Sequence, residues 1–551
     1  MDKKKGMNLK PACNSFCDSV FGEHPNQARF VICLVAVAGF FFFSRLPFFL
    51  YYPLPIASPD TVTYLWQLEK IEHGILPTFE LRTPGYPLFW WLCRMISHDV
   101  LFVIYAQNAI TLFSAILTLF LLARYSPGCL VPVAFSLSVF LSSPTHLAMD
   151  MFLLTESIFV NCMILFLIFL YVALRTGKTG FTWVGSLLAA AAIYIRPSAV
   201  FLIPILAIAS LLLFKKFGRK FSLALVVPAA GALSVLVLYN VFTIRLVALT
   251  GGGDWGMLWS TSVYLEPDPA LPDGVNEAII SKAAKIINSD KEIIYNSWDL
   301  IAFQQAIQRN IFHPMVPMAK VIGGPGTDPD PYLKQRGLYR QIYQTAIRQH
   351  PEVYFKNLLG AFILYFMKIG TSEWGDFYSF YPPKQYGETF VGQPASYVKA
   401  LKDYYNPKPH TEFRFTLLSD GRATVMTKPR RLTEFYSRYA RVRARLFQNS
   451  LWIIPIVFGL ILSVAELIRS QGASTDSLFV FLVILCLLGQ AAVCAVIGHV
   501  EKRYSATFDF VNYLLFALVP FVLCRKLKMQ PGRRNASPPG SPRVFGRKNQ
   551  G

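Results

Sequence analysis

The chain has 551 residues, of which 54% are hydrophobic and only 15% are charged, whereas an average soluble domain has about 25% charged residues. The formal net charge is +21, from 53 Lys and Arg against 32 Asp and Glu. Because much of this basic charge flanks long apolar runs, it fits membrane topology and anionic lipid headgroups. The composition argues against a soluble protein that binds nucleic acid.

Apolar runs recur along most of the chain and are candidates for membrane-spanning helices, which need about 20 residues. Residues 354–371 form a weaker run of the same kind. The sequence therefore predicts an all-α polytopic membrane protein with a helix bundle of ten or eleven spans. The ten stronger runs lie at residues 30–52, 100–124, 128–147, 151–174, 181–196, 198–214, 221–244, 449–468, 477–497 and 505–524.

The basic residues predict how these helices cross the membrane. The N-terminal MDKKK, the loop KKFGRK (215–220) and the Arg-rich tail at 525–551 are short basic segments, which favour the cytoplasmic side. With both termini inside, the number of spans is even, so we expect residues 354–371 to lie in the interface. The very basic stretch 428–447 would then be external, so eleven spans with the tail outside stay an open alternative.

The resulting organisation alternates membrane modules with hydrophilic regions. No cleavable signal peptide is expected before the first span. Nine cysteines without an even, spaced set indicate no disulfide framework. We expect a cytoplasmic N-terminus at 1–29, a seven-helix module at 30–245 with its first outer loop at 53–99, an extracytoplasmic region at 246–448, a three-helix module at 449–524 and a disordered basic tail at 525–551.

Ionisable residues cluster on the outer side of this topology. Asp60 follows the first span, Asp150 and Glu156 bracket the start of the fourth, and Arg196 joins the fifth and sixth. The segment HVEKRYSATFDF (499–510) joins the last two spans. Ionisable residues at membrane depth are functional candidates, and their clustering on one side predicts a shared site at the outer leaflet.

Each candidate also has a plain structural interpretation. Asp60 or Ser58 is suited to cap the helix TVTYLWQLEKI, and Arg82 is suited to reach lipid headgroups. Glu156 is suited to pair with an interior arginine. Chemically, a partly dry aspartate accepts a proton from a hydroxyl, and arginines bind phosphate with a planar fork of donors. Together these residue types indicate glycosyl or phosphoryl transfer from a lipid-linked donor.

Several motifs carry a family resemblance. The order PDTVTY, HGILP and RTPGYPLFWWL, followed by TESIF, AAAAIYIRPSAVFLIP and HVEKRY, resembles the GT-C glycosyltransferases. It is most similar to the protein mannosyltransferase and aminoarabinose transferase group, or glycosyltransferase family 39-like. The resemblance covers residues 30–245 and, more loosely, 340–524.

The resemblance implies an inverting glycosyltransferase that uses a polyprenyl-phosphate sugar at the outer face. It implies that Asp60 is the general base and that Glu156 or Asp150 is a second acid. The donor phosphate would be bound by Arg82, Arg503, Tyr504, Arg196 and Arg245, and the further site candidates are Tyr64, Tyr86, His499 and Glu501.

The motifs also differ from the family pattern. Thr61 follows Asp60 where many protein mannosyltransferases have a second acid, and RTPGYP replaces the KPPL form of the aminoarabinose branch. The acceptor therefore stays open among glycan, lipid and protein. We expect a multi-pass plasma (inner) membrane protein with its site on the periplasmic or extracytoplasmic side. No metal site is predicted, although a divalent cation stays an open alternative.

Two other functions are compatible with the same residues. One is a ligase or polymerase that moves a whole glycan from a polyprenyl diphosphate. The other is a transporter or flippase for a lipid-linked solute, which also accounts for charge within a membrane. Transport would favour charges along a path through the bilayer, whereas the predicted charges gather on one side.

Overall fold

The computed structural model describes a helical protein. It covers residues 27–51, 59–75, 82–245, 247–249, 252–283, 286, 288–310, 329–367, 438–439, 442, 453–470, 474–497 and 508–528. These residues are about 88% helical and include no strand. The prediction of an all-α protein is therefore confirmed for the described part of the chain.

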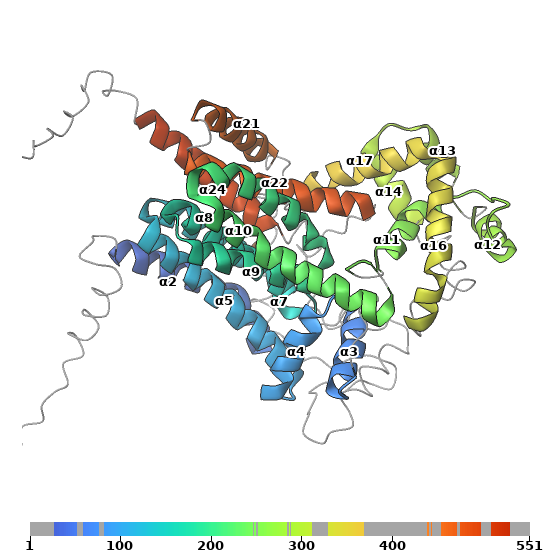
Figure 1. Cartoon of the computed structure of the whole chain (residues 1–551), viewed down its shortest axis with the longest axis horizontal. Coiled ribbons are helices and arrows are strands. Elements are labelled where there is room, and N and C mark those ends of the chain that lie inside the picture. The colour runs from blue at the N-terminus through green and yellow to red at the C-terminus, as the bar shows by residue number, and fades with distance from the viewer. Residues whose placement is uncertain are drawn as a thin grey trace, which may run out of the picture.

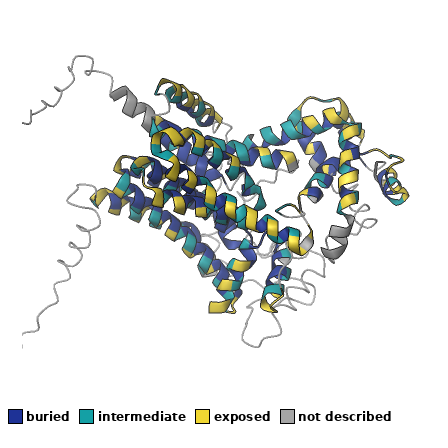
Figure 2. Ribbon diagram, viewed as in Figure 1, coloured by how far each residue is buried: buried dark blue, intermediate teal, exposed yellow. Residues whose placement is uncertain are grey.

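Most of the helices form one bundle with a continuous apolar core (Figure 1). In that view the bundle's first helix begins and its last helix ends on the left. Buried residues face its interior (Figure 2). Many of the exposed side chains are large and apolar, as expected of helices surrounded by lipid. The bundle contains α2 (Gln27–Tyr51), α5 (Val100–Tyr125), α6 (Leu130–Leu141), α7 (Pro144–Met151), α8 (Glu156–Thr176), α9 (Thr179–Ile195), α10 (Leu202–Ile244), α21 (Ile453–Arg469), α22 (Thr475–Ile497) and α24 (Asp509–Lys528), with the short 3-10 helices η1 (Pro127–Cys129) and η2 (Pro197–Phe201).

Among the described residues, 5 helices are long and apolar enough to cross a membrane, or 6 if α6 and α7 count together as one span. This supports a membrane-embedded protein but not the full count of ten or eleven. The difference has a physical reason: several predicted spans are shorter helices, such as α9 with its 17 residues, and two others belong to α10.

Helix α10 contains the predicted spans 198–214 and 221–244 as two arms of a hairpin. Gly218 has φ 80° and ψ 177°, which interrupts the helix. The Oγ atoms of Ser210 and Ser222 each donate to the other's carbonyl oxygen, at 3.2 and 3.1 Å. Twelve residues of straight helix would separate them by about 18 Å, so the chain reverses direction near Gly218.

The predicted single span 128–147 is interrupted by a break in the helix. Helix α6 ends at Leu141, and α7 begins at Pro144 after a bend of 70°. The chain can turn here because Pro144 lacks a backbone N–H and starts the next helix, where that donor is not needed. The break places two serines, Ser142 and Ser143, inside an otherwise apolar region.

A second group of helices lies beside the bundle and has its own apolar core, which includes Tyr264, Phe303 and Tyr339. Helices α14 and α16 both contribute to this core, through Phe303 and Tyr339. Helix α17 covers part of the predicted interfacial segment 354–371 and packs on both α14 and α22, so it joins the two groups. This outer group contains α11 (Gly252–Thr261), η3 (Ser262–Tyr264), α12 (Asp273–Ala283), α13 (Asn288–Asn296), α14 (Leu300–Asn310), α16 (Pro329–Gln349) and α17 (Pro351–Met367).

Candidate functional site

Two short helices, α3 (Pro59–Glu72) and α4 (Gly85–Ile96), stand at one end of the bundle. Because α3 begins at Pro59, a favoured first helical residue, Asp60 lies inside the first turn and not at the N-cap. The structure describes the backbone of Asp60 but not its side chain. The neighbouring Thr61 is buried, and its Oγ1 donates to the carbonyl oxygen of Leu153 at 3.1 Å. The start of α3 is thereby fixed on the segment between α7 and α8.

Arg82 lies against the same helix. Its Nε donates to Thr63 Oγ1 at 3.0 Å, and its guanidinium carbon is 5.2 Å from the ring centroid of Tyr64. Position 60 is one turn before Thr63 in α3, and residues three apart share a helix face. The predicted base and the predicted phosphate ligand therefore belong to one local unit.

Gly85 brings this unit against the end of α9. A Cβ built on Gly85 would lie 2.6 Å from the carbonyl carbon and oxygen of Tyr194 and 2.7 Å from the nitrogen of Ile195. Only glycine allows such an approach between two backbones. The residue that follows Ile195 is Arg196, so α4 starts beside the segment that carries this second arginine.

Arg196 forms an ion pair with Glu156. The Arg196 Nη1 to Glu156 Oε1 distance is 3.4 Å, and both side chains are almost fully buried. The guanidinium also lies 5.7 Å from the ring centroid of Phe159. Glu156 opens α8, where a negative charge is stabilised by the helix N-terminus. The structural interpretation of Glu156, as the partner of an interior arginine, is thus confirmed.

A second ion pair joins Arg45 of α2 to Asp150 of α7, and both side chains have 0% exposure. Arg45 Nε also donates to Asn108 Oδ1 at 2.7 Å, and its Nη1 donates to the Leu141 carbonyl oxygen at 3.0 Å. Arg45 was not among the residues predicted from the sequence. The signal was present, since a lone arginine inside the first apolar run is unusual.

The Asp150 carboxylate is fully engaged in this network. It accepts hydrogen bonds from Arg45, from Thr111 Oγ1 at 3.0 Å and from Ser157 Oγ at 2.6 Å. His146 Nε2 lies 3.6 Å from the same carboxylate, and this histidine was also missed. Both oxygens of the Asp150 carboxylate are therefore held by neighbouring side chains.

Tyr64 and Tyr86 connect α3 to this network. Their ring centroids are 5.1 Å apart in an edge-to-face arrangement. The Tyr86 hydroxyl donates to Gln107 Oε1 at 2.8 Å, and Gln107 Nε2 donates to the carbonyl oxygens of Asp150 and Phe152. Both tyrosines are buried, so they pack inside the cluster that joins α3 to this network.

Of the remaining candidates, the structure describes only Arg245. Arg245 is exposed and ends α10 in the left-handed conformation, with φ 53° and ψ 38°. His499, Glu501, Arg503 and Tyr504 lie outside the described residues. Within the described part of the chain, no group of three or more His, Cys, Asp or Glu side chains is suited to hold a metal.

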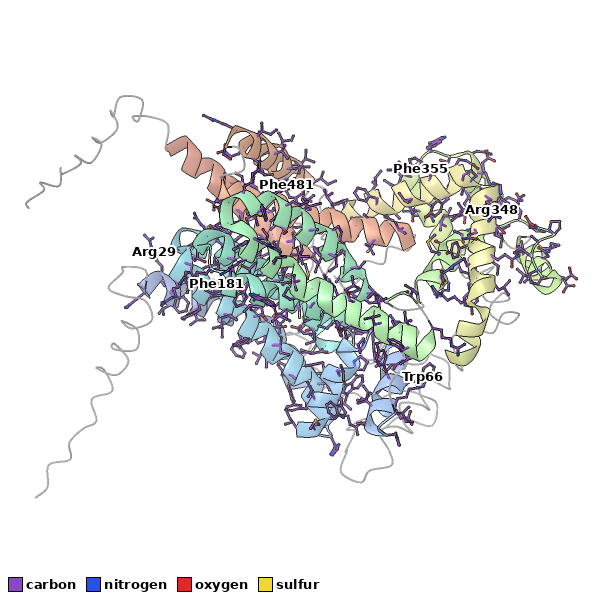
Figure 3. The ribbon with its side chains drawn as sticks, in the orientation of Figure 1. Arg29, Trp66, Phe181, Arg348, Phe355 and Phe481 are labelled. Carbon is purple, nitrogen blue, oxygen red and sulfur yellow. The ribbon has the colours of Figure 1, made fainter. Side chains whose placement is uncertain are left out.

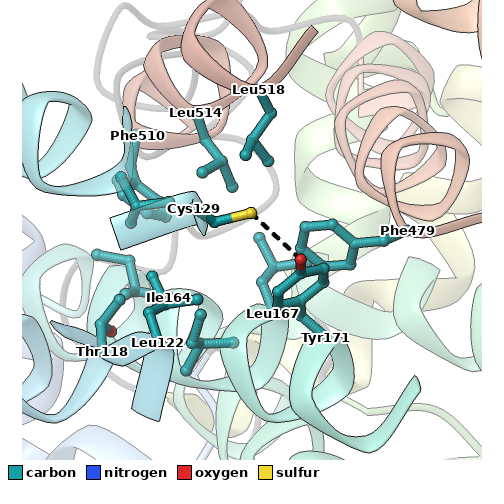
Figure 4. Close-up of a pocket in the computed structure, with 12 residues that line it drawn as sticks. Thr118, Leu122, Cys129, Ile164, Leu167, Tyr171, Phe479, Phe510, Leu514 and Leu518 are labelled. Carbon is teal, nitrogen blue, oxygen red and sulfur yellow. Dashed lines mark hydrogen bonds between the residues drawn. The ribbon is translucent and has the colours of Figure 1, made fainter. Parts of the chain in front are cut away.

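The bundle also contains an apolar hollow of about 20 Å³, far along α5 and α8 from this cluster (Figure 4). Its polar rim is the Tyr171 hydroxyl, which is 3.3 Å from Cys129 Sγ and 2.9 Å from Ser126 Oγ. A cavity of this size holds about one water molecule. None of the predicted site residues lines this hollow. The cluster formed by α3, α4, Glu156 and Arg196 therefore remains the candidate site.

No family model, curated protein or solved structure matches this chain. The motif resemblance to GT-C glycosyltransferases therefore stays a prediction, and the function has to be argued from the cluster itself.

Proposed function

We propose that the chain is an inverting glycosyltransferase, which moves one sugar from a polyprenyl-phosphate donor to an acceptor hydroxyl at the outer face of the membrane. One observation carries the proposal. Four segments converge through the contacts Thr61–Leu153, Gly85–Tyr194 and Glu156–Arg196, namely the first turn of α3, the first turn of α4, the α7–α8 segment and the α9–η2 segment. These segments carry the acid and arginine candidates that such a reaction needs.

In the proposed reaction Asp60 takes the proton of the acceptor hydroxyl as its oxygen attacks the anomeric carbon. The bond between that carbon and the phosphate oxygen breaks, and polyprenyl phosphate leaves with the electron pair. Arg82 stabilises the phosphate as its charge grows. The hydrogen bond from Arg82 Nε to Thr63 Oγ1 fixes the orientation in which the guanidinium group meets the phosphate in this proposal.

In this proposal, Glu156 and Arg196 hold other groups of the site in position. The opposite charges of this nearly buried pair cancel, so the pair adds no net charge to the site. The positive charge of Arg82 then attracts the anionic donor. Glu156 is three residues from Leu153, whose carbonyl fixes the start of α3. Movement of Glu156 would therefore be transmitted to the turn that contains Asp60.

The test is transfer by the purified full-length protein in proteoliposomes, with a panel of labelled polyprenyl-phosphate monosaccharides. Release of labelled sugar, or its transfer to an added acceptor, from one donor supports the proposal and identifies the sugar. Turnover only with diphosphate-linked oligosaccharides would support a ligase or polymerase. No turnover of any donor by folded protein would contradict the proposal.

A transporter or flippase is the second candidate, favoured by a specific observation. The break between α6 and α7 interrupts an apolar pair of helices next to the buried Arg45–Asp150 pair, and broken helices with polar residues at membrane depth occur in transporters. Movement of a labelled lipid-linked donor across the bilayer, without its cleavage, would favour this function.

A further inference from the structure

A second charged surface lies at the end of the bundle opposite the candidate site. Helix α8 runs from Glu156 to Thr176, so Arg175 is about 28 Å from Glu156 along the helix axis. Three connections meet around Arg175: the α8–α9 link, the turn of the α10 hairpin and the start of α22. We call this group of residues the basic end.

Direct contacts hold the basic end together. A Cβ on Gly177 would be 3.3 Å from the Phe217 ring, which places the α8–α9 link against the hairpin turn. Lys216 Nζ donates to Thr475 Oγ1 at 3.1 Å, which joins the turn to α22. Arg175 Nε is 3.5 Å from Asp476 Oδ1.

The charge of the basic end is strongly one-sided. Asp476 is the carboxylate in these contacts, and Arg175 pairs with it. The side chains of the hairpin turn are exposed to the surroundings. The cations are Arg175, Lys178, Lys215, Lys216, Arg219 and Lys220.

Exposed apolar residues stand on both sides of this charge. Before the turn, Leu211 is 77% exposed and Phe214 is 51% exposed; after it, Leu223 is 48% exposed. Exposed apolar side chains on a membrane helix face lipid tails. Cations between two such stretches therefore lie at the level of the headgroups, which distinguishes this surface from one that binds a soluble polyanion.

We propose that the basic end is a binding site for anionic phospholipid headgroups, with the α10 hairpin turn as its main contact. Lys215, Arg219 and Lys220 contact the phosphates from the exposed turn. Lys216 keeps the turn attached to α22, and the Arg175–Asp476 pair joins α22 to α8. A bound lipid would thus bridge the hairpin and the α8–α9 link and stabilise their packing.

Native mass spectrometry of the full-length protein in uncharged detergent, titrated with phosphatidylglycerol or phosphatidylcholine, tests this site. The wild type is expected to bind phosphatidylglycerol more tightly, and added salt should weaken that preference. The variant Lys215→Gln/Arg219→Gln should bind phosphatidylglycerol about 30-fold more weakly at low salt, since each cation near the surface contributes about 1 kcal/mol. Binding of phosphatidylcholine should not change.

The matched control is Lys291→Gln/Arg348→Gln, which removes one lysine and one arginine from the outer group of helices. Arg348 lies there, far from Arg29 and Phe181 at the other end of the molecule (Figure 3). The control should keep the wild-type affinity. Equal affinity of both variants, or a wild type that does not distinguish the two lipids, would overturn the proposal. Full competition by glycerophosphoglycerol, which lacks acyl chains, would also overturn it.

Discussion

Arg45 and Asp150 are 105 residues apart in the sequence, yet they form an ion pair that is completely buried in the bundle. The pair fixes α2 to α7 immediately beside the break between α6 and α7. Through Gln107, which holds the carbonyl oxygens of Asp150 and Phe152, the same network supports the backbone that leads to Leu153 and α3. The pair thus supports the backbone of the candidate site from within the bundle.

Removal of either partner of this pair should be strongly destabilising. Arg45→Met or Asp150→Asn leaves a charge or several hydrogen-bonding groups uncompensated in the core, which costs about 3–5 kcal/mol. The double variant should lose less than the sum of the two single variants. Thermal unfolding of the protein in detergent measures this, and additive losses would show that the two residues act independently.

Gly85→Ala should disturb the approach of α4 to α9. The new Cβ would clash with the Tyr194 carbonyl group at 2.6 Å, and backbone atoms cannot rotate away. Such overpacking costs about 1–3 kcal/mol and should separate Arg82 from Arg196. Gly231→Ala in α10 is the control, because a Cβ there meets nothing within 4 Å. Equal unfolding midpoints for the two variants would contradict the close contact.

Arg82→Ala is expected to raise the donor KM by about tenfold or more, because it removes the charge and the fork of donors that bind phosphate. Arg82→Lys should recover only part of the affinity, since an ammonium group does not reproduce the planar geometry. Steady-state titration of the donor measures both. An unchanged KM for Arg82→Ala would return this residue to a role at the lipid headgroups.

Lowering the pH should unfold the region around Asp290 before the rest of the outer group of helices. Hydrogen bonds from the Arg309 guanidinium, with a further one from Asn310, lower the pKa of the Asp290 carboxyl. A lowered folded pKa stabilises the protein above the unfolded value of about 3.9, and this stability is lost as the pH falls through the folded value.

Hydrogen exchange of α13 and α14 in the full-length protein measures the effect. Relative to the intrinsic exchange rate at each pH, the protection of these helices in wild type should fall below about pH 4. Asp290→Asn should exchange faster already at neutral pH and should lack the acid step. An identical acid step in both proteins would assign the transition to other carboxyl groups.

Sequence patterns predicted the helical character well because apolar runs and helix periodicity are local properties. The predicted spans coincide with helices α2, α5, α8, α9, α22 and α24. The break at Ser142–Ser143 was missed, although these serines and Pro144 interrupt the apolar run from 128 to 147. Its bend depends on contacts made elsewhere, such as the one from Arg45 to Leu141.

The candidate site was predicted in part. Ionisable residues near the ends of apolar runs identified Asp60, Arg82, Glu156 and Arg196, three of which carry contacts described above. The partners could not be predicted, because pairing of Glu156 with Arg196 or of Arg45 with Asp150 requires the three-dimensional packing of distant helices. The contact of Gly85 with Tyr194 is equally non-local.

The most direct test of the central claim is the turnover of the cleaved donor by wild type and Asp60→Asn in proteoliposomes. Asp99→Asn, in the same outer loop, is the matched control because Asp99 caps α5 through Leu101 N. Loss of a general base lowers the rate by about 10²–10⁴-fold. We predict this loss for Asp60→Asn, with an unchanged unfolding midpoint and near wild-type turnover for Asp99→Asn. Wild-type turnover by Asp60→Asn would contradict the account.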